Sequence, residues 1–287
     1  MIPAPFEYHR PKSVDETLGL LAQYGDEARI VAGGHSLIPM MKLRMAQPEH
    51  LVDLRHVADL DFIREDAGSL VIGAMVTQTA LITSALVRDK CPIIPEASAQ
   101  IADPQVRNCG TIGGNLANGD PGNDLPAVML ALDATYDVVS KSGTRQVAAR
   151  AFYKGALETA LEDGELLSAV RIPIPAAGCG HAYAKQKRKI GDYATAAAAV
   201  LVTMSGGKCT DAAVALTNVG NTPLLADAAA RALVGTSVDA AAINAAATAA
   251  MAITAPASDT RGPAEFRTRV AGVMVRRAIE AARGRAG

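Results

Sequence analysis

Two short segments, VAGGHSLIPM at 31–40 and GTIGGNLANG at 110–119, each place a Gly-Gly pair directly after an apolar run. Glycine has no Cβ, so it allows positive φ angles and lets the backbone approach a ligand closely. Successive backbone N–H groups in such a turn converge on one point, which creates a binding site for an anion. Each segment is therefore predicted to form a sharp corner after a strand-like run. We refer to residues 32–36 as the first corner and to residues 111–115 as the second corner.

A single Gly-Gly corner is more often a tight turn than a ligand site. Neither segment fits G-x-G-x-x-G or G-x-x-x-x-G-K-[ST], so the Rossmann and P-loop interpretations are excluded. The first corner adds the Ser36 hydroxyl, and the second adds the Thr111 hydroxyl and the Asn115 amide. Two such corners in one chain favour two backbone nests that share the pyrophosphate of a dinucleotide.

The composition excludes several other classes of function. Lys and Arg total 28 against 29 Asp and Glu, so no basic face for nucleic acid is predicted. The four cysteines stand singly and the five histidines show no ligand spacing along the chain, so the chain is predicted to hold no metal or iron–sulfur cluster. No apolar run is long enough to span a membrane, and the first residues lack a secretory signal. We expect a cytoplasmic protein, with an association with the inner face of the membrane left open.

Helices and strands are expected to alternate over the first part of the chain. Ser13 and Glu16 form a capping box for a helix that ends at Gly25, and Thr77 caps a second helix that ends near Leu86. A third helix is expected to be capped by Asn123 or Asp124, with Pro126 in its first turn. The other expected elements are strands at 28–32 and 50–54, hairpins at 61–73 and 134–149, and a strand at 166–175. Because this last strand contains prolines, which remove ladder donors, it is predicted to lie at a sheet edge.

The segment 173–180 is rich in Pro, Gly and small residues, so it is the expected domain boundary. Beyond it, three strands are predicted within 182–220, and three helices at 224–234, 239–253 and 263–283. The second domain is therefore expected to be a small three-stranded antiparallel sheet covered by three helices, which makes the whole chain an α+β protein.

Three longer segments resemble a known family: AGGHSLIPMMKLRMAQPEHLVDL, DPQVRNCGTIGGNLANGDPGNDLPAVMLALDA and KRKIGDYATAAAAV. They resemble the flavoprotein (medium) subunits of the molybdenum hydroxylases, the family of xanthine dehydrogenase and aerobic carbon monoxide dehydrogenase, and the carbon monoxide dehydrogenase subunit in particular. The resemblance runs over essentially the whole chain. It implies an FAD-binding domain of the p-cresol methylhydroxylase/vanillyl-alcohol oxidase type, made of two α/β subdomains, over residues 1–177. A CO dehydrogenase flavoprotein C-terminal domain follows over residues 178–287.

The resemblance also assigns residues to FAD. The residues that match the two FAD loops are Ala32, Gly33, Gly34, His35 and Ser36 for the first, and Thr111, Ile112, Gly113, Gly114 and Asn115 for the second. Asp124 matches an acidic residue that bonds the ribityl or ribose hydroxyls, and Lys185 matches a basic residue near the ring. The positions expected to pack against the flavin are Ile101, Leu167 and Tyr193.

Each of these polar positions keeps an alternative interpretation. His35 is a positioning residue or a general base, and Asp124 is a helix N-cap or a cofactor ligand. The basic run at 185–189 is a solvated strand, or part of it faces the cofactor or a partner. Tyr193 is a core aromatic or a flavin contact. Arg107 forms a loop ion pair or contacts the FAD phosphates.

The implied function is an FAD-binding electron-transfer subunit without an acid, base or nucleophile of its own. In a carbon monoxide dehydrogenase, CO and water would be oxidised to CO2 on a large molybdenum-cofactor subunit. The electrons would pass through two 2Fe-2S clusters of a small subunit to FAD and on to a quinone or other acceptor, in a dimer of heterotrimers. The alternatives are a sister hydroxylase acting on an aldehyde, a purine or an N-heterocycle, and a flavin-binding module without a redox role.

Overall fold

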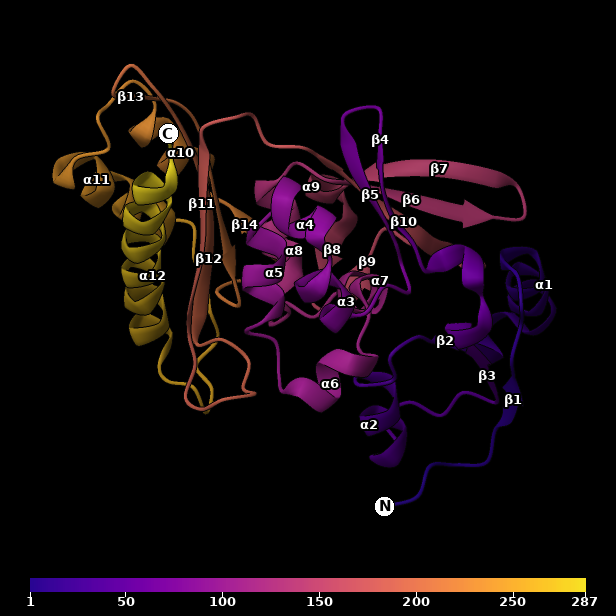
Figure 1. The fold of residues 1–287 in the computed structure, drawn as a ribbon. Helices are drawn as coiled ribbons and strands as arrows, with labels where there is room; N and C mark the ends of the chain where they lie inside the picture. Colours follow the sequence, from indigo (N-terminus) through magenta and orange to yellow (C-terminus); the bar gives the residue numbers. More distant parts are fainter.

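Three sheets of three, five and four strands organise the chain, together with a short two-stranded ribbon, β8 (Tyr153–Gly155) and β9 (Glu158–Thr159). The computed structural model describes all residues from Met1 to Gly287. Figure 1 shows the three sheets spread along the molecule, with a group of short helices between the five-stranded and four-stranded sheets. No helix has the length and apolar character that crossing a bilayer requires.

The N-terminal sheet is parallel, with the order β1-β3-β2. Its elements are β1 (Glu7–His9), α1 (Val14–Tyr24), η1 (Gly25–Glu27), β2 (Ala28–Val31), α2 (Leu37–Lys42) and β3 (His50–Asp53). The predicted cap of α1 is confirmed, because the Glu16 N–H donates to Ser13 Oγ over 3.1 Å. Helix α1 buries Leu18 and Leu21 against this sheet. Strand β2 ends at Val31, directly before the first corner.

The five-stranded sheet has the order β4-β5-β10-β6-β7 and is antiparallel throughout. Its strands are β4 (Ile63–Asp66), β5 (Ser69–Gly73), β6 (Thr135–Ser140), β7 (Gly143–Ala148) and β10 (Leu166–Pro173). The prediction of an edge position for β10 is wrong, because this strand lies at the centre of the sheet. Pro173 is its last residue, opposite Ser69, so the interior of the strand keeps all its N–H donors.

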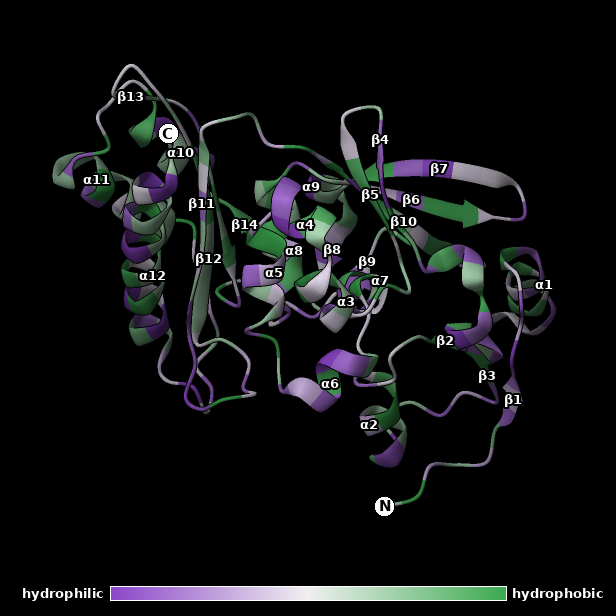
Figure 2. Ribbon diagram, viewed as in Figure 1, coloured by the Kyte–Doolittle hydropathy of each residue, from purple (hydrophilic) through white to green (hydrophobic).

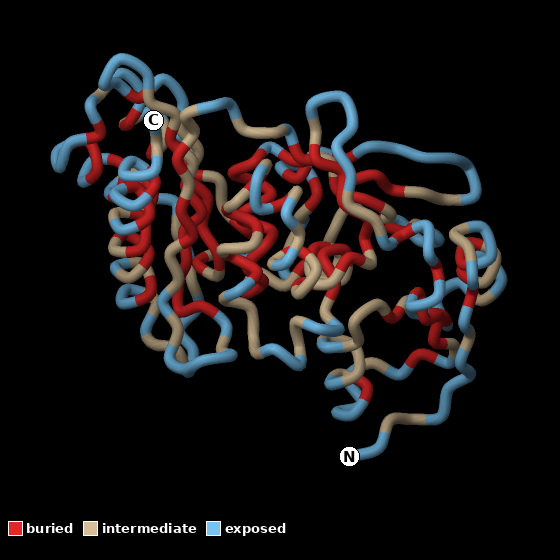
Figure 3. Tube along the Cα trace, in the orientation of Figure 1, coloured by how far each residue is buried: buried red, intermediate tan, exposed pale blue.

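Short helices fill the space beside this sheet. They are η2 (Leu54–His56), η3 (Ala58–Leu60), α3 (Gln78–Thr83), α4 (Ala85–Lys90), α5 (Ile93–Ser98), α6 (Pro104–Cys109), α7 (Ile112–Ala117), α8 (Asp124–Ala131) and α9 (Ala149–Phe152). The single helix expected after Thr77 is divided at Ser84, whose hydroxyl accepts from the Val87 N–H and starts α4. Helix α8 is buried along its whole length, as the tube in Figure 3 shows, and forms the middle of the largest apolar core.

The C-terminal sheet is antiparallel with the order β11-β12-β13-β14. Its elements are β11 (Cys179–Gln186), β12 (Ala196–Ser205), β13 (Lys208–Thr217) and β14 (Leu224–Leu225), followed by α10 (Asp227–Leu233), α11 (Ala240–Met251) and α12 (Ala264–Arg285). The predicted count of three strands is wrong. Leu224 and Leu225, expected to begin a helix, instead pair with Leu216 and Ala215 and pack their side chains on the two cores.

Strand β12 joins the two parts of the protein because both of its faces are buried. Ala197 and Ala199 pack into the core that contains α8, whereas Ala198 and Val200 pack into the core under α12. Alternate residues of a strand point to opposite faces, so this Ala-rich run serves two cores at once. Figures 1 and 2 show the resulting layers, with the apolar sheet between α12 and the central helices. The arrangement brings β11 alongside α5 and α8 of the N-terminal half of the chain.

Candidate functional site

A cleft of about 700 Å³ lies where the N-terminal subdomain, the central helices and the C-terminal sheet meet. Both corners line it, together with the segment 161–167 and the 191–193 loop of the C-terminal part. All of the residues predicted to bind FAD line this cleft except Ile112, whose side chain is fully buried in the main core. Fourteen of the fifteen residues assigned to FAD therefore line one cleft.

The first corner packs closely against residues 109–114, which lead into and include part of the second corner. A Cβ atom built on Gly33 would lie 2.5 Å from the carbonyl oxygen of Cys109 and 2.6 Å from the Cα of Gly110. A Cβ on Gly114 would lie 3.5 Å from that of Ala32. Since no side chain fits at Gly33 without backbone movement, glycine is required there by the close approach of the two segments.

The first corner presents free backbone donors to the cleft. Gly34 has a φ of 75°, in the left-handed region that glycine adopts without strain. None of the N–H groups of residues 32–37 donates a hydrogen bond within the chain. His35 is exposed and its side chain makes no hydrogen bond within the chain, so nothing prepares it to act as a base. A run of unused N–H groups at a glycine turn is the arrangement predicted for anion binding.

The second corner differs from the prediction, because it forms the first turn of helix α7. The N–H groups of residues 112–115 all have acceptors within the chain: Val76 O, Ala74 O, Thr111 Oγ1 and Thr111 O, in that order. The prediction of a second backbone nest is therefore wrong. What this corner offers to the cleft is side chains, among them the Oδ1 atom of Asn115, which is buried and has no partner. Gln78, beside it on α3, presents a second buried and unpartnered acceptor, Oε1.

Asp124 is held by two residues of strand β11. The Lys185 ammonium donates to its Oδ2 over 2.7 Å, and the Tyr183 hydroxyl donates to its Oδ1 over 2.5 Å. The side chains of Asp124 and Lys185 are 5% and 1% exposed, so this ion pair is shielded from water. Burial raises the pKa of Asp124, and the Lys185 charge opposes that shift. The N-cap interpretation of Asp124 is wrong, because α8 begins at this residue and its N-cap position is Asn123.

Three cations hold the backbone of the 100–101 segment at the rim of the cleft. The carbonyl of Gln100 accepts from Lys185 over 3.3 Å and from Lys187 over 3.2 Å. Arg107 donates to the carbonyl of Ile101 over 2.8 Å. Arg107 forms no ion pair and does not line the cleft, whereas Lys185, the first residue of the basic run at 185–189, does line it. Desolvation, followed by the neighbouring Lys185 charge, lowers the pKa of Lys187.

Tyr193 is one of the residues of the C-terminal part that line the cleft. This residue is 40% exposed, so the core-aromatic interpretation is wrong. The ring rests against Gly122, where an added Cβ would lie 2.9 Å from Tyr193 Cδ1, and the Arg261 guanidinium lies 5.8 Å from the ring centroid. Partial burial and then the Asp120 carboxylate raise the pKa of Tyr193 to about 12. The phenol is therefore neutral at physiological pH.

Among the residues that sequence reasoning missed are Tyr183, which bonds Asp124 without lining the cleft itself, and Gln78, which does line it. A signal for Tyr183 was present, because it stands two positions before Lys185 on one strand, and residues i and i+2 share a face. Gln78 carried no signal, since it follows the helix cap Thr77 and reads as an ordinary polar residue of the first turn.

The cleft fits FAD on its own chemistry. Free N–H donors at the first corner suit a pyrophosphate, and two unpartnered buried acceptors suit hydroxyl or amino groups. Apolar side chains of Ile101 and Leu167 line the same cleft, as expected for the face of a ring system. The cleft holds no nucleophile paired with a base, so its residues are suited to binding and orienting a cofactor.

Comparisons with known proteins agree with this geometry. Residues 4–175 match the family described as the FAD binding domain in molybdopterin dehydrogenase, and residues 181–282 match the CO dehydrogenase flavoprotein C-terminal domain. The chain therefore belongs to the FAD-binding subunits of the molybdenum hydroxylases. This confirms the predicted family, the FAD cofactor and the assignment as an oxidoreductase subunit.

Two relatives and one solved structure match this chain over its full length. The chain is 61% identical over 286 residues to the carbon monoxide dehydrogenase medium chain of Afipia carboxidovorans, covering 100% of this chain and 99% of that one. A chain in the crystal structure of the cyanide-inactivated Cu,Mo-CO dehydrogenase matches with a TM-score of 0.98 and 61% identity, covering 100% of both chains. The 6-hydroxypseudooxynicotine dehydrogenase subunit alpha of Paenarthrobacter nicotinovorans is 38% identical, covering 100% of this chain and 97% of its own.

Proposed function

We propose that this chain is the FAD-carrying electron-transfer subunit of an aerobic carbon monoxide dehydrogenase. The observation that carries the proposal is the 61% identity to a carbon monoxide dehydrogenase medium chain over the full length. The complex would convert CO and H2O to CO2, two protons and two electrons on a large subunit that holds the molybdenum cofactor. A small subunit with two 2Fe-2S clusters would connect that site to this chain. A dimer of such heterotrimers, with a quinone as acceptor at the inner face of the cytoplasmic membrane, completes the proposal.

FAD would supply the redox chemistry, and the residues of this chain would bind and orient it. The N–H groups of the first corner would bind the pyrophosphate, with the Thr111 and Asn115 side chains beside it. Asp124, fixed by Lys185, would face the ribityl or ribose hydroxyls. The ring would lie against the apolar residues of the cleft, with Tyr193 added from the C-terminal part. The division into domains over 1–177 and 178–287 is part of this proposal.

The test is CO-dependent dye reduction by the intact complex, purified through this subunit. Activity with CO, and none with aldehydes, purines or N-heterocycles, is expected. A complex that reduces the dye only with one of these other substrates would assign the chain to a sister hydroxylase, as the 38% identical relative also allows. The complex could also bind flavin and yet fail to reduce the dye, both with every substrate tested and after reduction by dithionite. In that case the chain is a flavin-binding module.

A variant separates the role of this subunit from that of its partners. In a complex carrying Gly33→Ala, CO should still bleach the iron–sulfur absorption, while dye reduction through FAD is lost. Bleaching that disappears together with dye reduction would show that the variant disrupts the assembly rather than the FAD site.

A further inference from the structure

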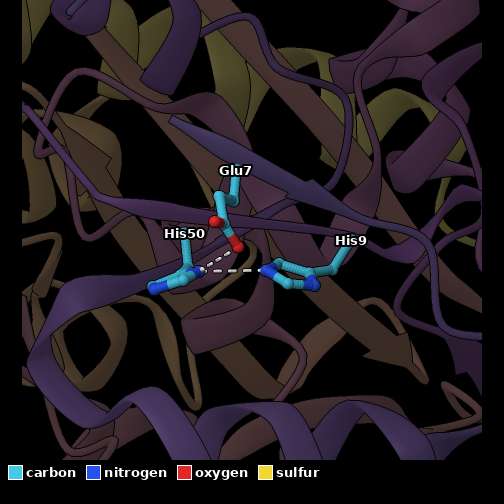
Figure 4. A group of neighbouring side chains, drawn as sticks. All are labelled: Glu7, His9 and His50. Atoms are coloured by element: carbon cyan, nitrogen blue, oxygen red, sulfur yellow. Dashed lines mark hydrogen bonds and ion pairs between the residues drawn. The ribbon is translucent and has the colours of Figure 1, made fainter. Parts of the chain in front are cut away.

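Glu7, His9 and His50 converge on the N-terminal sheet, away from the corners that line the cleft. Glu7 and His9 are two positions apart on β1, so their side chains share one face of the strand. The parallel register sets Glu7 directly opposite His50 of β3. Figure 4 shows the two imidazole rings and the carboxylate directed toward one another. The separation of 41 residues between the histidines is why no ligand spacing was visible along the sequence.

The three potential ligand atoms are spaced for one metal ion. His9 Nε2 lies 3.0 Å from His50 Nδ1, His50 Nδ1 lies 3.6 Å from Glu7 Oε2, and all three atoms lie within 4.8 Å of one another. Tetrahedral zinc with bonds of about 2.0–2.1 Å sets its ligand atoms about 3.3–3.4 Å apart. Side-chain movements of a few tenths of an ångström would therefore place the two nitrogens at coordination distance.

The surroundings fix the orientation of His50 and leave Glu7 accessible to solvent. The Tyr24 ring stacks on His50 with centroids 3.7 Å apart and an interplanar angle of 15°, which fixes the orientation of that imidazole. The His50 side chain is only 13% exposed, whereas that of Glu7 is 73% exposed and opens a path from solvent. Between Glu7 and His9, Tyr8 donates to Asp53 Oδ2 over 2.5 Å, which also ties β1 to β3.

We propose that Glu7, His9 and His50 bind a divalent transition-metal ion of the Zn²⁺ class, with the fourth position open to water. Two imidazoles and one carboxylate are a ligand set that zinc uses when a position is left open. The ion would clip the short strand β1, which has only three residues, onto β3. Without an ion, the two imidazoles would share one proton in the hydrogen bond seen here, which is the rival interpretation.

The test is titration of the intact protein complex with Zn²⁺ alone, followed by calorimetry and by X-ray absorption at the zinc edge. We expect the wild-type complex to bind one more zinc ion per chain, in a saturable way, than the complex that carries His50→Gln. Two imidazole nitrogens should lie in the coordination shell of that ion. Loss of an outer hydrogen-bond partner costs a metal site about 10- to 100-fold in affinity, so loss of a ligand in His9→Gln or His50→Gln should cost at least as much.

His56→Gln is the matched control, because His56 is exposed on the neighbouring turn η2 and lies outside the cluster. It should leave zinc affinity unchanged, and all variants should keep the wild-type FAD content. Because His50→Gln could disturb folding through the lost Tyr24 contact, the exposed Glu7→Gln provides a second variant, expected to weaken zinc binding without changing the melting temperature of the metal-free protein. Equal zinc binding by wild type, His9→Gln and His50→Gln, or no saturable binding at all, would overturn the proposal.

Discussion

Replacing Lys185 with Met should destabilise the protein strongly, and by an amount that depends on pH. The side chain of Lys185 is 1% exposed and its ammonium lies 2.7 Å from Asp124 Oδ2, whose side chain is 5% exposed. Removing one partner of a buried ion pair typically costs about 3–5 kcal/mol, because the other charge stays buried without compensation. Lys185→Met is therefore expected to lose this amount of the free energy of unfolding at pH 8.

The pH dependence follows from the pKa of Asp124, which burial already raises. A carboxyl whose folded-state pKa is raised contributes stability that is present at low pH and is lost as the pH rises through that pKa. Protonating a carboxyl of ordinary pKa, about 3.9, costs about 1.5 kcal/mol at pH 5 and about 5.6 kcal/mol at pH 8. In Lys185→Met, Asp124 can take up a proton and so become neutral. The destabilisation due to its unpaired carboxylate should therefore fall to at most about 1.5 kcal/mol at pH 5.

The assay is denaturant unfolding of wild type, Lys185→Met, Asp124→Asn and the double variant at pH 5 and pH 8, with bound flavin quantified in each sample. Arg150→Met is the matched control, because the Arg150–Asp133 pair has a similar distance, 2.8 Å, but side chains that are 50% and 66% exposed. It should cost less than about 1 kcal/mol. A Lys185→Met penalty that equals the control, or that grows as the pH falls, would refute this reasoning.

Three further predictions test other parts of the structure. Gly33→Ala forces a Cβ into the backbone of the neighbouring segment, so it should lower the FAD content. In the control Gly19→Ala the Cβ has open space, and the FAD content should stay much higher; equal FAD contents would contradict the packing described. Cys109 is exposed and should react with a thiol reagent in the native protein, whereas burial raises the pKa of Cys91 to about 12, so Cys91 should react only after unfolding, as mass mapping of the labelled thiols would show. Arg267→Met should lower the free energy of unfolding by at least about 2 kcal/mol, because the buried guanidinium donates to several backbone carbonyls that would lose their partner, and a thermal melt like that of wild type would argue against this role.

Local signals in the sequence predicted most of the elements. The Ser13 cap of α1 and the apolar runs of β2 and β12 depend on neighbours close in the chain, and the structure confirms them. The place of β10 in its sheet was not predictable in this way, since it is decided by strands distant in sequence. There, a proline at the end of a strand was mistaken for one in its interior.

In the candidate site, too, local features were predicted correctly, whereas features that depend on contacts distant in sequence were not. The residues of the first corner were predicted from glycine chemistry and family resemblance, and they line the cleft. The second corner was misjudged because hydrogen-bond partners decide whether an N–H group is free. Two of its four N–H groups bond to Ala74 and Val76 of another segment, and the other two bond to Thr111, the N-cap of α7. The Asp124–Lys185 contact spans 61 residues and depends on how β11 docks against α8, which no local pattern records.

The most direct test of the central claim is the visible absorption spectrum of the intact complex, purified through this subunit, with the released flavin quantified per chain. The account predicts flavin bands above iron–sulfur absorption and one FAD per chain, with the FAD lost in Gly33→Ala. A wild-type complex that contains no flavin and does not take up added FAD would contradict the claim that the first corner and its cleft bind FAD.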